Sequence, residues 1–166
     1  MNNITSHWFY NNEILEIPPH DMAGFVYMIT NMTNQKKYIG RKYFGKYRRV
    51  KKSGSTRRKI IRSDSDWKEY IGSSDELKKD IEILGKDKFK FEILIMGRTR
   101  GQVNFLEETT HHKMDVILRD DFYNLAIGPR RFMNINLQED IKLRLGDIVK
   151  NHYINHDHES PTITIN

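Results

Sequence analysis

Apolar residues cluster along the chain in short segments with two different periods. Residues 24–31 are rich in β-branched and aromatic residues and predict a strand. A run of turn-forming residues follows, and residues 37–43 have the composition of a second strand, so the two segments predict a β-hairpin. Phe and Ile then occupy alternate positions of residues 89–96, which predicts a third long strand.

Helical periodicity marks three further segments. In the first, residues 73–76 form a capping box, and apolar residues follow at i, i+4 and i+7 before a glycine ends the helix. The second helix begins at a capping box in residues 99–102 and extends to about Leu118. The third begins in residues 136–139 and reaches about Tyr153.

These elements predict one small α/β domain, with a short antiparallel sheet flanked by helices. We assign this domain to residues 22–128. Residues 1–21 contain Trp8 and end at a pair of prolines, so we expect an N-terminal arm that packs on the core without belonging to it. Residues 129–166 predict a C-terminal helix followed by a polar tail.

Positive charge is concentrated in residues 36–62, which contain 13 of the 28 Lys and Arg residues and no Asp or Glu. The rest of the chain carries more acidic than basic residues, although the net charge is +6. Such a patch attracts a polyanion at one place and repels it elsewhere. Because residues 44–64 are rich in Gly, Ser and charge, we expect them to begin as a short helix or loop and to continue as a mobile loop.

Composition also excludes several classes of protein. The chain has no Cys, which rules out disulfides and thiolate zinc sites and is compatible with a reducing cytoplasm. No apolar run approaches the roughly 20 residues of a membrane span, and the N-terminus lacks the pattern of a secretory signal. The partner suggested by the charge is therefore a nucleic acid and not a membrane.

Two tyrosine motifs frame the predicted hairpin, Phe25-Val26-Tyr27 and Tyr38-Ile39-Gly40. Beyond them come an arginine, an acidic pair on a later predicted helix, and a Tyr-Asn pair. In this order the residues resemble the GIY-YIG nuclease family, and the stretches 66–70 and 89–92 resemble a phage-type branch of it. The resemblance covers residues 22–128. The chain departs from the family pattern at Phe25, which replaces a glycine, and lacks a histidine in the region where many members have one.

The resemblance implies a metal-dependent DNA endonuclease with a tyrosine-assisted mechanism and a single Mg²⁺ or Mn²⁺. It implies that Glu107 is the metal ligand. The catalytic residues that it implies are Tyr27, Tyr38, Arg48, Glu107 and Asn124. A phenol whose pKa is lowered below about 10 by nearby positive charge could accept a proton from water. An arginine offers a planar fork for phosphate oxygens, and a carboxylate suits a hard cation. Arg49 and Glu108 remain alternatives one position away.

The basic segment supplies the predicted DNA contacts: Arg41, Lys42, Lys46, Arg49, Lys51, Lys52, Arg57, Arg58 and Lys59. We expect the partner to be double-stranded DNA, and the lack of an obvious second DNA-reading domain favours a compact or homodimeric enzyme. We expect a cytoplasmic location in a bacterial or phage-infected cell.

Two other functional interpretations stay open. One is a non-catalytic DNA-binding module that retains the nuclease hairpin, and the other is an RNA-binding protein that stacks bases on Tyr38, Tyr43 and Tyr47. A second Tyr-Ile-Gly at residues 70–72 is too distant from Tyr27 for the hairpin, and we interpret it as a chance recurrence or a structural turn. The His111-His112 pair is expected to be solvated.

Overall fold

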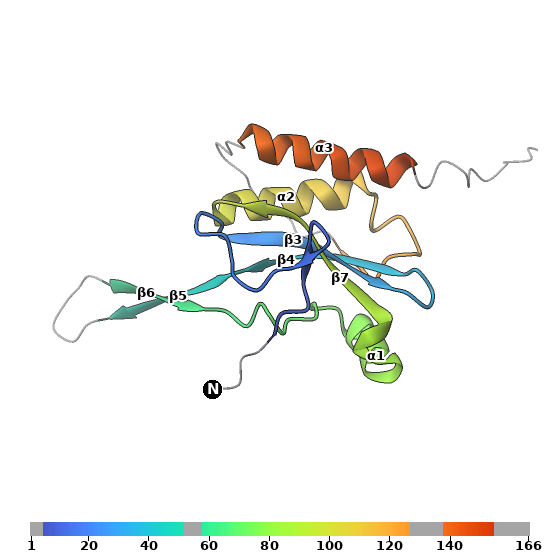
Figure 1. The fold of residues 1–166 in the computed structure, drawn as a ribbon, viewed down its shortest axis with the longest axis horizontal. Helices are drawn as coiled ribbons and strands as arrows, with labels where there is room; N and C mark the ends of the chain where they lie inside the picture. The colour runs from blue at the N-terminus through green and yellow to red at the C-terminus, as the bar shows by residue number, and fades with distance from the viewer. Residues whose placement is uncertain (1–4, 52–57, 127–137, 155–166) are drawn as a thin grey trace, which may run out of the picture.

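A five-stranded sheet forms the centre of the protein, for which the computed structural model describes residues 5–51, 58–126 and 138–154 (Figure 1). The strands of the sheet are β1 (Phe9–Tyr10), β2 (Glu13–Ile14), β3 (Gly24–Asn31), β4 (Lys37–Tyr43) and β7 (Phe89–Gly97). Their order is β2-β1-β7-β3-β4, with β4 at one edge. The predicted α/β class is confirmed. The sheet is antiparallel except between β1 and β7, which run parallel.

Helices cover both faces of the sheet, because alternate strand residues are apolar on each side. On one face, α1 (Asp75–Leu84) packs Leu77 and Ile81 into a core of large aromatic residues, and the short helix η1 (Lys86–Lys88) leads into β7. On the other face, α2 (Arg100–Lys113) packs Leu106 against a smaller aliphatic core. Helix α3 (Glu139–Ile154) lies on α2 and β7, which agrees with the predicted last helix.

The predicted hairpin is confirmed as β3 and β4, and it places the two tyrosine motifs side by side. Tyr27 lies opposite Gly40 in the register of the two strands. The pairing of β3 with β7 shifts between Val26 and Tyr27, so Leu94 has no partner in β3. The carbonyl oxygen of Leu94 instead accepts a hydrogen bond of 2.8 Å from Arg144 Nε. The contact ties α3 to the sheet beside Tyr27.

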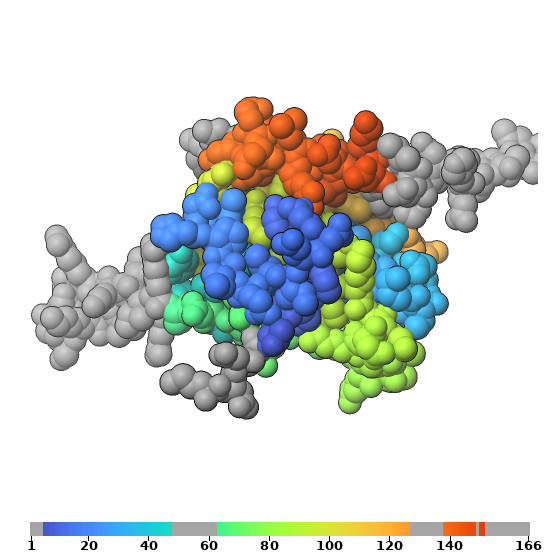
Figure 2. Space-filling view, in the orientation of Figure 1, coloured from blue at the N-terminus to red at the C-terminus, as the bar shows by residue number. Residues whose placement is uncertain are grey.

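The N-terminal residues belong to the sheet, whereas we expected an arm that packs on the core without belonging to it. Phe9 pairs with Glu92 of β7, and Trp8 is fully buried in the aromatic core. The indole of Trp8 donates a 2.7 Å hydrogen bond to the carbonyl of Trp67. Burial of this large ring outweighs the polar character of its neighbours in sequence. In Figure 2 the N-terminal segment, in dark blue, covers the centre of the visible face.

The basic segment forms a β-ribbon, so the predicted short helix or loop was wrong. Strands β5 (Gly45–Lys51) and β6 (Arg58–Asp64) pair antiparallel and project from the body of the protein (Figure 1). Tyr, Val and Ile within these strands have high β propensity, and the many charges between them obscured that pattern. Part of the expected mobile loop, residues 52–57, lies outside the described residues.

Helix α2 ends at Lys113, five residues before the predicted end at Leu118. Met114 and Val116 turn inward into the aliphatic core, and Asp115 between them has a φ of 50°. A left-handed residue ends the helix. The apolar residues after Lys113 are therefore buried in a turn and do not continue the helix.

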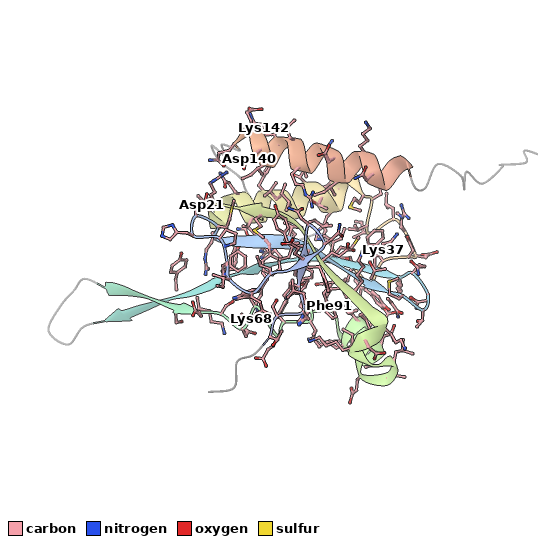
Figure 3. The ribbon with its side chains drawn as sticks, viewed as in Figure 1. Asp21, Lys37, Lys68, Phe91, Asp140 and Lys142 are labelled. Atoms are coloured by element: carbon pink, nitrogen blue, oxygen red, sulfur yellow. The ribbon has the colours of Figure 1, made fainter. Side chains whose placement is uncertain are left out.

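Arg98 joins three parts of the chain at one end of the sheet. Its guanidinium forms ion pairs with Asp21 at 2.9 Å and with Asp140 of α3 at 3.2 Å. These two carboxylates, which are labelled in Figure 3, lie near each other at this end of the sheet. No helix in the described ranges combines the length and apolar character needed to cross a bilayer.

Candidate active site

A cavity of about 560 Å³ opens at the edge strand β4. Successive residues of this strand face opposite sides of the sheet, so the cavity receives side chains from both. Residues from β3, the β4–β5 region, the segment before α1, and α2 line it: Tyr27, Tyr38, Gly40, Arg41, Lys42, Tyr43, Gly45, Lys46, Tyr47, Ser65, Tyr70, Ser73, Arg100 and Glu107. The cavity thus contains both motif tyrosines and the predicted glutamate.

The two motif tyrosines lie on the same face of the hairpin, as the sequence suggested. Their ring centroids are 6.1 Å apart, and both rings belong to the aromatic core. Tyr27 is 1% exposed and Tyr38 is 9% exposed. The hydroxyl of Tyr38 shares a 2.7 Å hydrogen bond with Ser73 Oγ. Both phenols are therefore packed and oriented by the protein.

Burial sets the acidity of these phenols in the opposite direction to our expectation. It raises the pKa of Tyr27 well above the usual value of 10, and neighbouring Tyr38 and Tyr70 add to the effect. Burial also raises the pKa of Tyr38, although the hydrogen bond with Ser73 partly offsets the rise. Arg41 acts to lower the pKa of Tyr27 but is the smallest contribution. Burial therefore opposes the lowering that we expected from nearby arginine and metal charge, and the catalytic role of the two phenols stays a prediction.

On the other face of β4, α2 carries a row of polar side chains, of which Arg100 and Glu107 line the cavity. Glu107 forms an ion pair with Arg41, and Asn104 accepts a hydrogen bond from the Tyr43 hydroxyl. One turn earlier, the Arg100 guanidinium lies over the Tyr43 ring, 4.3 Å from its centroid. These α2 residues are spaced by four and three positions and therefore share one face of the helix.

Arg100 is a cavity residue that sequence reasoning missed. Its Nη2 donates a 2.6 Å hydrogen bond to the carbonyl of Gly45, and its guanidinium also lies 4.4 Å from the ring centroid of Tyr47. Its Nε is buried and has no hydrogen-bond partner among the described residues. A buried donor of this kind can donate a hydrogen bond to a ligand oxygen at little further cost. The only signal in the sequence is the position of Arg100 at the start of the helix that carries Glu107.

Asn124 holds the backbone of the second tyrosine motif. Its amide oxygen accepts from the Ile39 nitrogen at 2.9 Å, and its amide nitrogen donates to the Ile39 oxygen at 2.8 Å. His111 Nε2 donates to the same Ile39 oxygen at 3.1 Å. His111 is buried, contrary to the expected solvated pair, and burial lowers its pKa. Asn124 thus holds the backbone of β4 by hydrogen bonds, and its role in catalysis stays a prediction.

The predicted arginine lies in the ribbon. Arg48 belongs to β5, where its backbone pairs with Ile61, and Arg49 pairs with Ile60. The side chains of both lie outside the described part of the chain, so their catalytic role stays a prediction. The described guanidinium groups in the cavity are those of Arg41, which we had assigned to DNA contacts, and Arg100.

Acidic residues from other elements neutralise part of the basic segment. Asp66 forms ion pairs with Lys42 at 3.2 Å and with Lys46 at 2.9 Å, and these contacts lower the pKa of Asp66 to about 2. The remaining predicted DNA contacts in the described residues, Lys51, Arg58 and Lys59, are in the ribbon strands. Lys52 and Arg57 lie outside the described residues.

The second Tyr-Ile-Gly, which we interpreted as a chance recurrence or a structural turn, packs directly against the two tyrosine motifs. The Tyr70 ring meets the Tyr27 ring edge-on, with centroids 6.1 Å apart. Gly72 has a φ of 96°, and a Cβ there would lie 3.3 Å from the Tyr38 ring. The repeated tripeptide itself was the signal that could have placed this segment at the site.

Comparison with known proteins agrees with this geometry. Residues 8–127 match the family described as "Putative endonuclease segE, GIY-YIG domain". No curated protein and no solved structure shows significant similarity to the chain. The matched range covers most of the chain and includes every described residue of the cavity. The chain therefore belongs to the segE GIY-YIG endonuclease family.

Proposed function

We propose that this protein is a metal-dependent endonuclease that hydrolyses phosphodiester bonds in double-stranded DNA. The observation that carries the proposal is the meeting of the Arg41–Glu107 pair with the Tyr27 and Tyr38 phenols in one cavity. Phosphodiester hydrolysis needs positive charge for the phosphoryl oxygens, an oriented water and a stabilised leaving oxygen. The family match supports nuclease activity in general.

The donor set of the cavity fits a single hard cation. Glu107 is the carboxylate among the described lining residues, and the described ranges contain no cluster of three or more His, Cys, Asp or Glu that could hold a metal. Mg²⁺ suits this arrangement, because it keeps several waters and binds through one or two carboxylates together with substrate phosphates. When bound, the cation would offset the negative charge that develops on the leaving oxygen.

Arg41 and Arg100 are the described groups suited to bind phosphate oxygens. Guanidinium is planar, permanently charged and able to donate two parallel hydrogen bonds to phosphate. Arg41 follows the Tyr-Ile-Gly of β4 directly and already binds one carboxylate, that of Glu107. The positive charge of Arg41, and of a cation that Glu107 would hold, would both favour a phosphate in the cavity. Arg48 stays a candidate for the same role.

The ribbon is the part of the protein best suited to grip duplex DNA. A two-stranded β-ribbon fits the major groove of B-DNA. Lys51 lies opposite Arg58 in the register of β5 and β6. Like charges at directly opposite positions destabilise a ribbon unless an anion offsets them. DNA phosphates would provide that anion, and their counterions would be released on binding.

The geometry argues against an RNA-binding platform built from Tyr38, Tyr43 and Tyr47. Tyr38 is buried, so a base cannot stack on its ring without disrupting the core. The Arg100 guanidinium covers the rings of both Tyr43 and Tyr47. The stacking surface that such a platform needs is therefore largely occupied.

Incubation of the purified protein with supercoiled plasmid tests the proposal. We expect cleavage with Mg²⁺ or Mn²⁺ and none with EDTA. Glu107→Gln should abolish cleavage and retain DNA binding, because it removes the negative charge of the carboxylate and hardly changes the volume of the side chain. Glu108→Gln, one position along the same helix, is the matched control and should cut like the wild type.

Other results would point to other functions. Tight binding of duplex DNA without cleavage in either metal would show a non-catalytic DNA-binding module. Displacement of bound DNA by single-stranded RNA would show an RNA-binding protein. Loss of cleavage in Glu108→Gln with full activity in Glu107→Gln would move the metal ligand by one residue.

A further inference from the structure

The sheet and the ribbon are joined through one residue. Strand β4 ends at Tyr43 and β5 begins at Gly45, so Phe44 alone separates the edge strand of the sheet from the first strand of the ribbon. Phe44 is buried, and its ring centroid lies 5.2 Å from those of both Phe25 and Trp67. This packing fixes the point where the ribbon begins. Contacts of the first ribbon residues then set its direction.

Arg100 of α2 makes such contacts on both sides of the junction. Its Nη2 donates a 2.6 Å hydrogen bond to the carbonyl of Gly45. Its guanidinium lies 4.3 Å from the ring centroid of Tyr43, in β4, and 4.4 Å from that of Tyr47, in β5. A guanidinium is planar, so it can stack on aromatic rings and still donate hydrogen bonds in its own plane. One side chain of α2 thus holds the end of the sheet and the start of the ribbon together.

The other strand of the ribbon is tied to the same junction. Ser65 follows β6 directly, and its hydroxyl donates a 2.6 Å hydrogen bond to the carbonyl of Tyr43. The backbone nitrogen of Ser65 donates to the carbonyl of Phe44 at 2.9 Å. Both strands are therefore anchored where they leave the body. Arg100 adds the anchor that comes from the helix of Glu107.

We propose that Arg100 is a positioning residue that sets where the scissile phosphate lies relative to the DNA held by the ribbon. Arg100 and Glu107 both belong to α2, about two turns apart on one face of the helix. The same helix therefore holds the base of the ribbon and the carboxylate of the cavity. This proposal rests on the proposed endonuclease function and adds to it the residue that determines the position of the cut.

The length of the ribbon explains why a contact at its base matters. The ribbon projects from the body of the protein (Figure 1). Strand β5 has 7 residues, which at about 3.3 Å each give an arm of about 20 Å. A rotation of about 10° at the base would move the far end by roughly 4 Å, whereas a reacting group has to be held within about 0.5 Å. A lost contact at the base would therefore misplace the DNA in the cavity.

A direct contact between Arg100 and a phosphate would be a different role, and the two roles predict different effects. Positioning through the ribbon needs the ring of Tyr47, because that ring is the ribbon side chain on which the guanidinium lies. A contact with phosphate needs only the positive charge of Arg100. Substitutions on the two sides of the Arg100–Tyr47 contact therefore separate the roles.

A covalent link between the ribbon and DNA would measure the position of the cut directly. The chain has no Cys, so Lys59→Cys in β6 provides a single thiol, which can form a disulfide with a thiol tethered to one base of a duplex. With Mg²⁺, the linked protein should cut at one fixed distance from that base. Adding Arg100→Met should spread the cuts over several base pairs and slow cleavage about 10²-fold, because a misplacement of about 1 Å has that effect. The link excludes weaker binding as the cause.

Matched variants show whether the effect belongs to this contact. Arg98→Met is the control, because Arg98 lies two positions earlier and pairs with Asp21 and Asp140 instead of the ribbon. It should leave the position and the rate of cleavage unchanged. Arg100→Lys keeps the charge but loses the planar group, so its cuts should spread as in Arg100→Met. Tyr47→Leu should also spread the cuts, and its combination with Arg100→Met should be no worse than either change alone.

Circular dichroism and thermal unfolding establish that each variant is folded, and Tyr47→Leu carries the test if Arg100→Met does not fold. The inference would be overturned by a single cut position in Arg100→Met, by full activity in Arg100→Lys, or by losses that add in the double variant. A ribbon thiol that forms no link to DNA would also overturn it. Each of these results leaves the endonuclease function intact. A wild-type protein that does not cut plasmid with Mg²⁺ or Mn²⁺ would overturn the proposed function itself.

Discussion

A Cβ atom on Gly40 would lie 2.5 Å from the hydroxyl oxygen of Tyr27, its partner across the β3–β4 hairpin. The last residue of the second tyrosine motif therefore leaves the space that the phenol of the first motif fills. The two motifs are coupled by volume as well as by register, because no larger residue fits at position 40 without moving Tyr27.

Gly40→Ala tests this coupling. We expect it to lower the free energy of unfolding by about 1–3 kcal/mol, as overpacking of a core does, and to abolish cleavage by displacing the Tyr27 phenol. Chemical denaturation and plasmid cleavage measure the two effects. Gly146→Ala, where a Cβ meets nothing within 4 Å, is the matched control and should leave both unchanged or raise stability. An active, stable Gly40→Ala protein would contradict the coupling.

Asn124→Ala should impair cleavage through the position of β4. It removes both hydrogen bonds between the Asn124 amide and the Ile39 backbone, which lies between Tyr38 and Gly40. We expect a loss of about 1–2 kcal/mol in the free energy of unfolding and a large drop in the cleavage rate, with DNA affinity retained. Asn124→Asp keeps an acceptor for the Ile39 nitrogen but loses the donor, so an intermediate effect is expected. Equal rates in Asn124→Ala and the wild type would exclude a positioning role.

Reversing the charge of Lys51, Arg58 and Lys59 to Glu should weaken DNA binding through the ribbon. The slope of log affinity against log salt should fall by about 0.9 for each phosphate that the ribbon no longer neutralises. Titration of labelled duplex at several salt concentrations measures the slope. Reversal of Lys79, Lys142 and Lys150, which lie on helices α1 and α3, is the control and should change the slope less. An unchanged slope in the ribbon variant would place the DNA on another surface.

Tyr123→Phe should remove one source of alkaline instability. The Tyr123 hydroxyl donates to Asp80 at 2.6 Å and accepts from Asn31 at 3.0 Å, and burial and the contact with Asp80 raise its pKa from 10 to about 12. The neutral phenol is thus favoured in the folded state. Its contribution to stability is complete below pH 10 and is lost as the pH rises from 10 through about 12.

Unfolding measured across that range gives the check. The stability difference between the wild type and Tyr123→Phe, about 1–2 kcal/mol at neutral pH, should shrink as the solution becomes alkaline. Tyr10→Phe serves as the control. A difference that stays constant with pH would show that the Tyr123 phenol does not ionise in the folded protein over that range.

Local patterns were sufficient to predict most of the elements. The sequence predicted the β3–β4 hairpin, β7, α1 and the start of α2. It could do so because alternation of apolar residues, capping boxes and turn residues each act within a few positions of the chain. The same reasoning failed in the ribbon, where frequent charges hid the β-forming residues of β5 and β6. It also failed at the end of α2, where burial of Met114 and Val116 overrides helical propensity.

The sequence by itself determined the order of the chemistry: two tyrosine motifs, a basic segment, a glutamate on a helix and an asparagine near the end of the domain. Only the tertiary structure decided which residues share the cavity. Packing of α2 on β4 brought Arg41 to Glu107, and the segment before α1 brought Tyr70 to Tyr27. Burial, moreover, depends on contacts between residues far apart in the chain. For that reason no pattern in the sequence could show that Tyr27 and Tyr38 lie inside a core that raises the pKa of both.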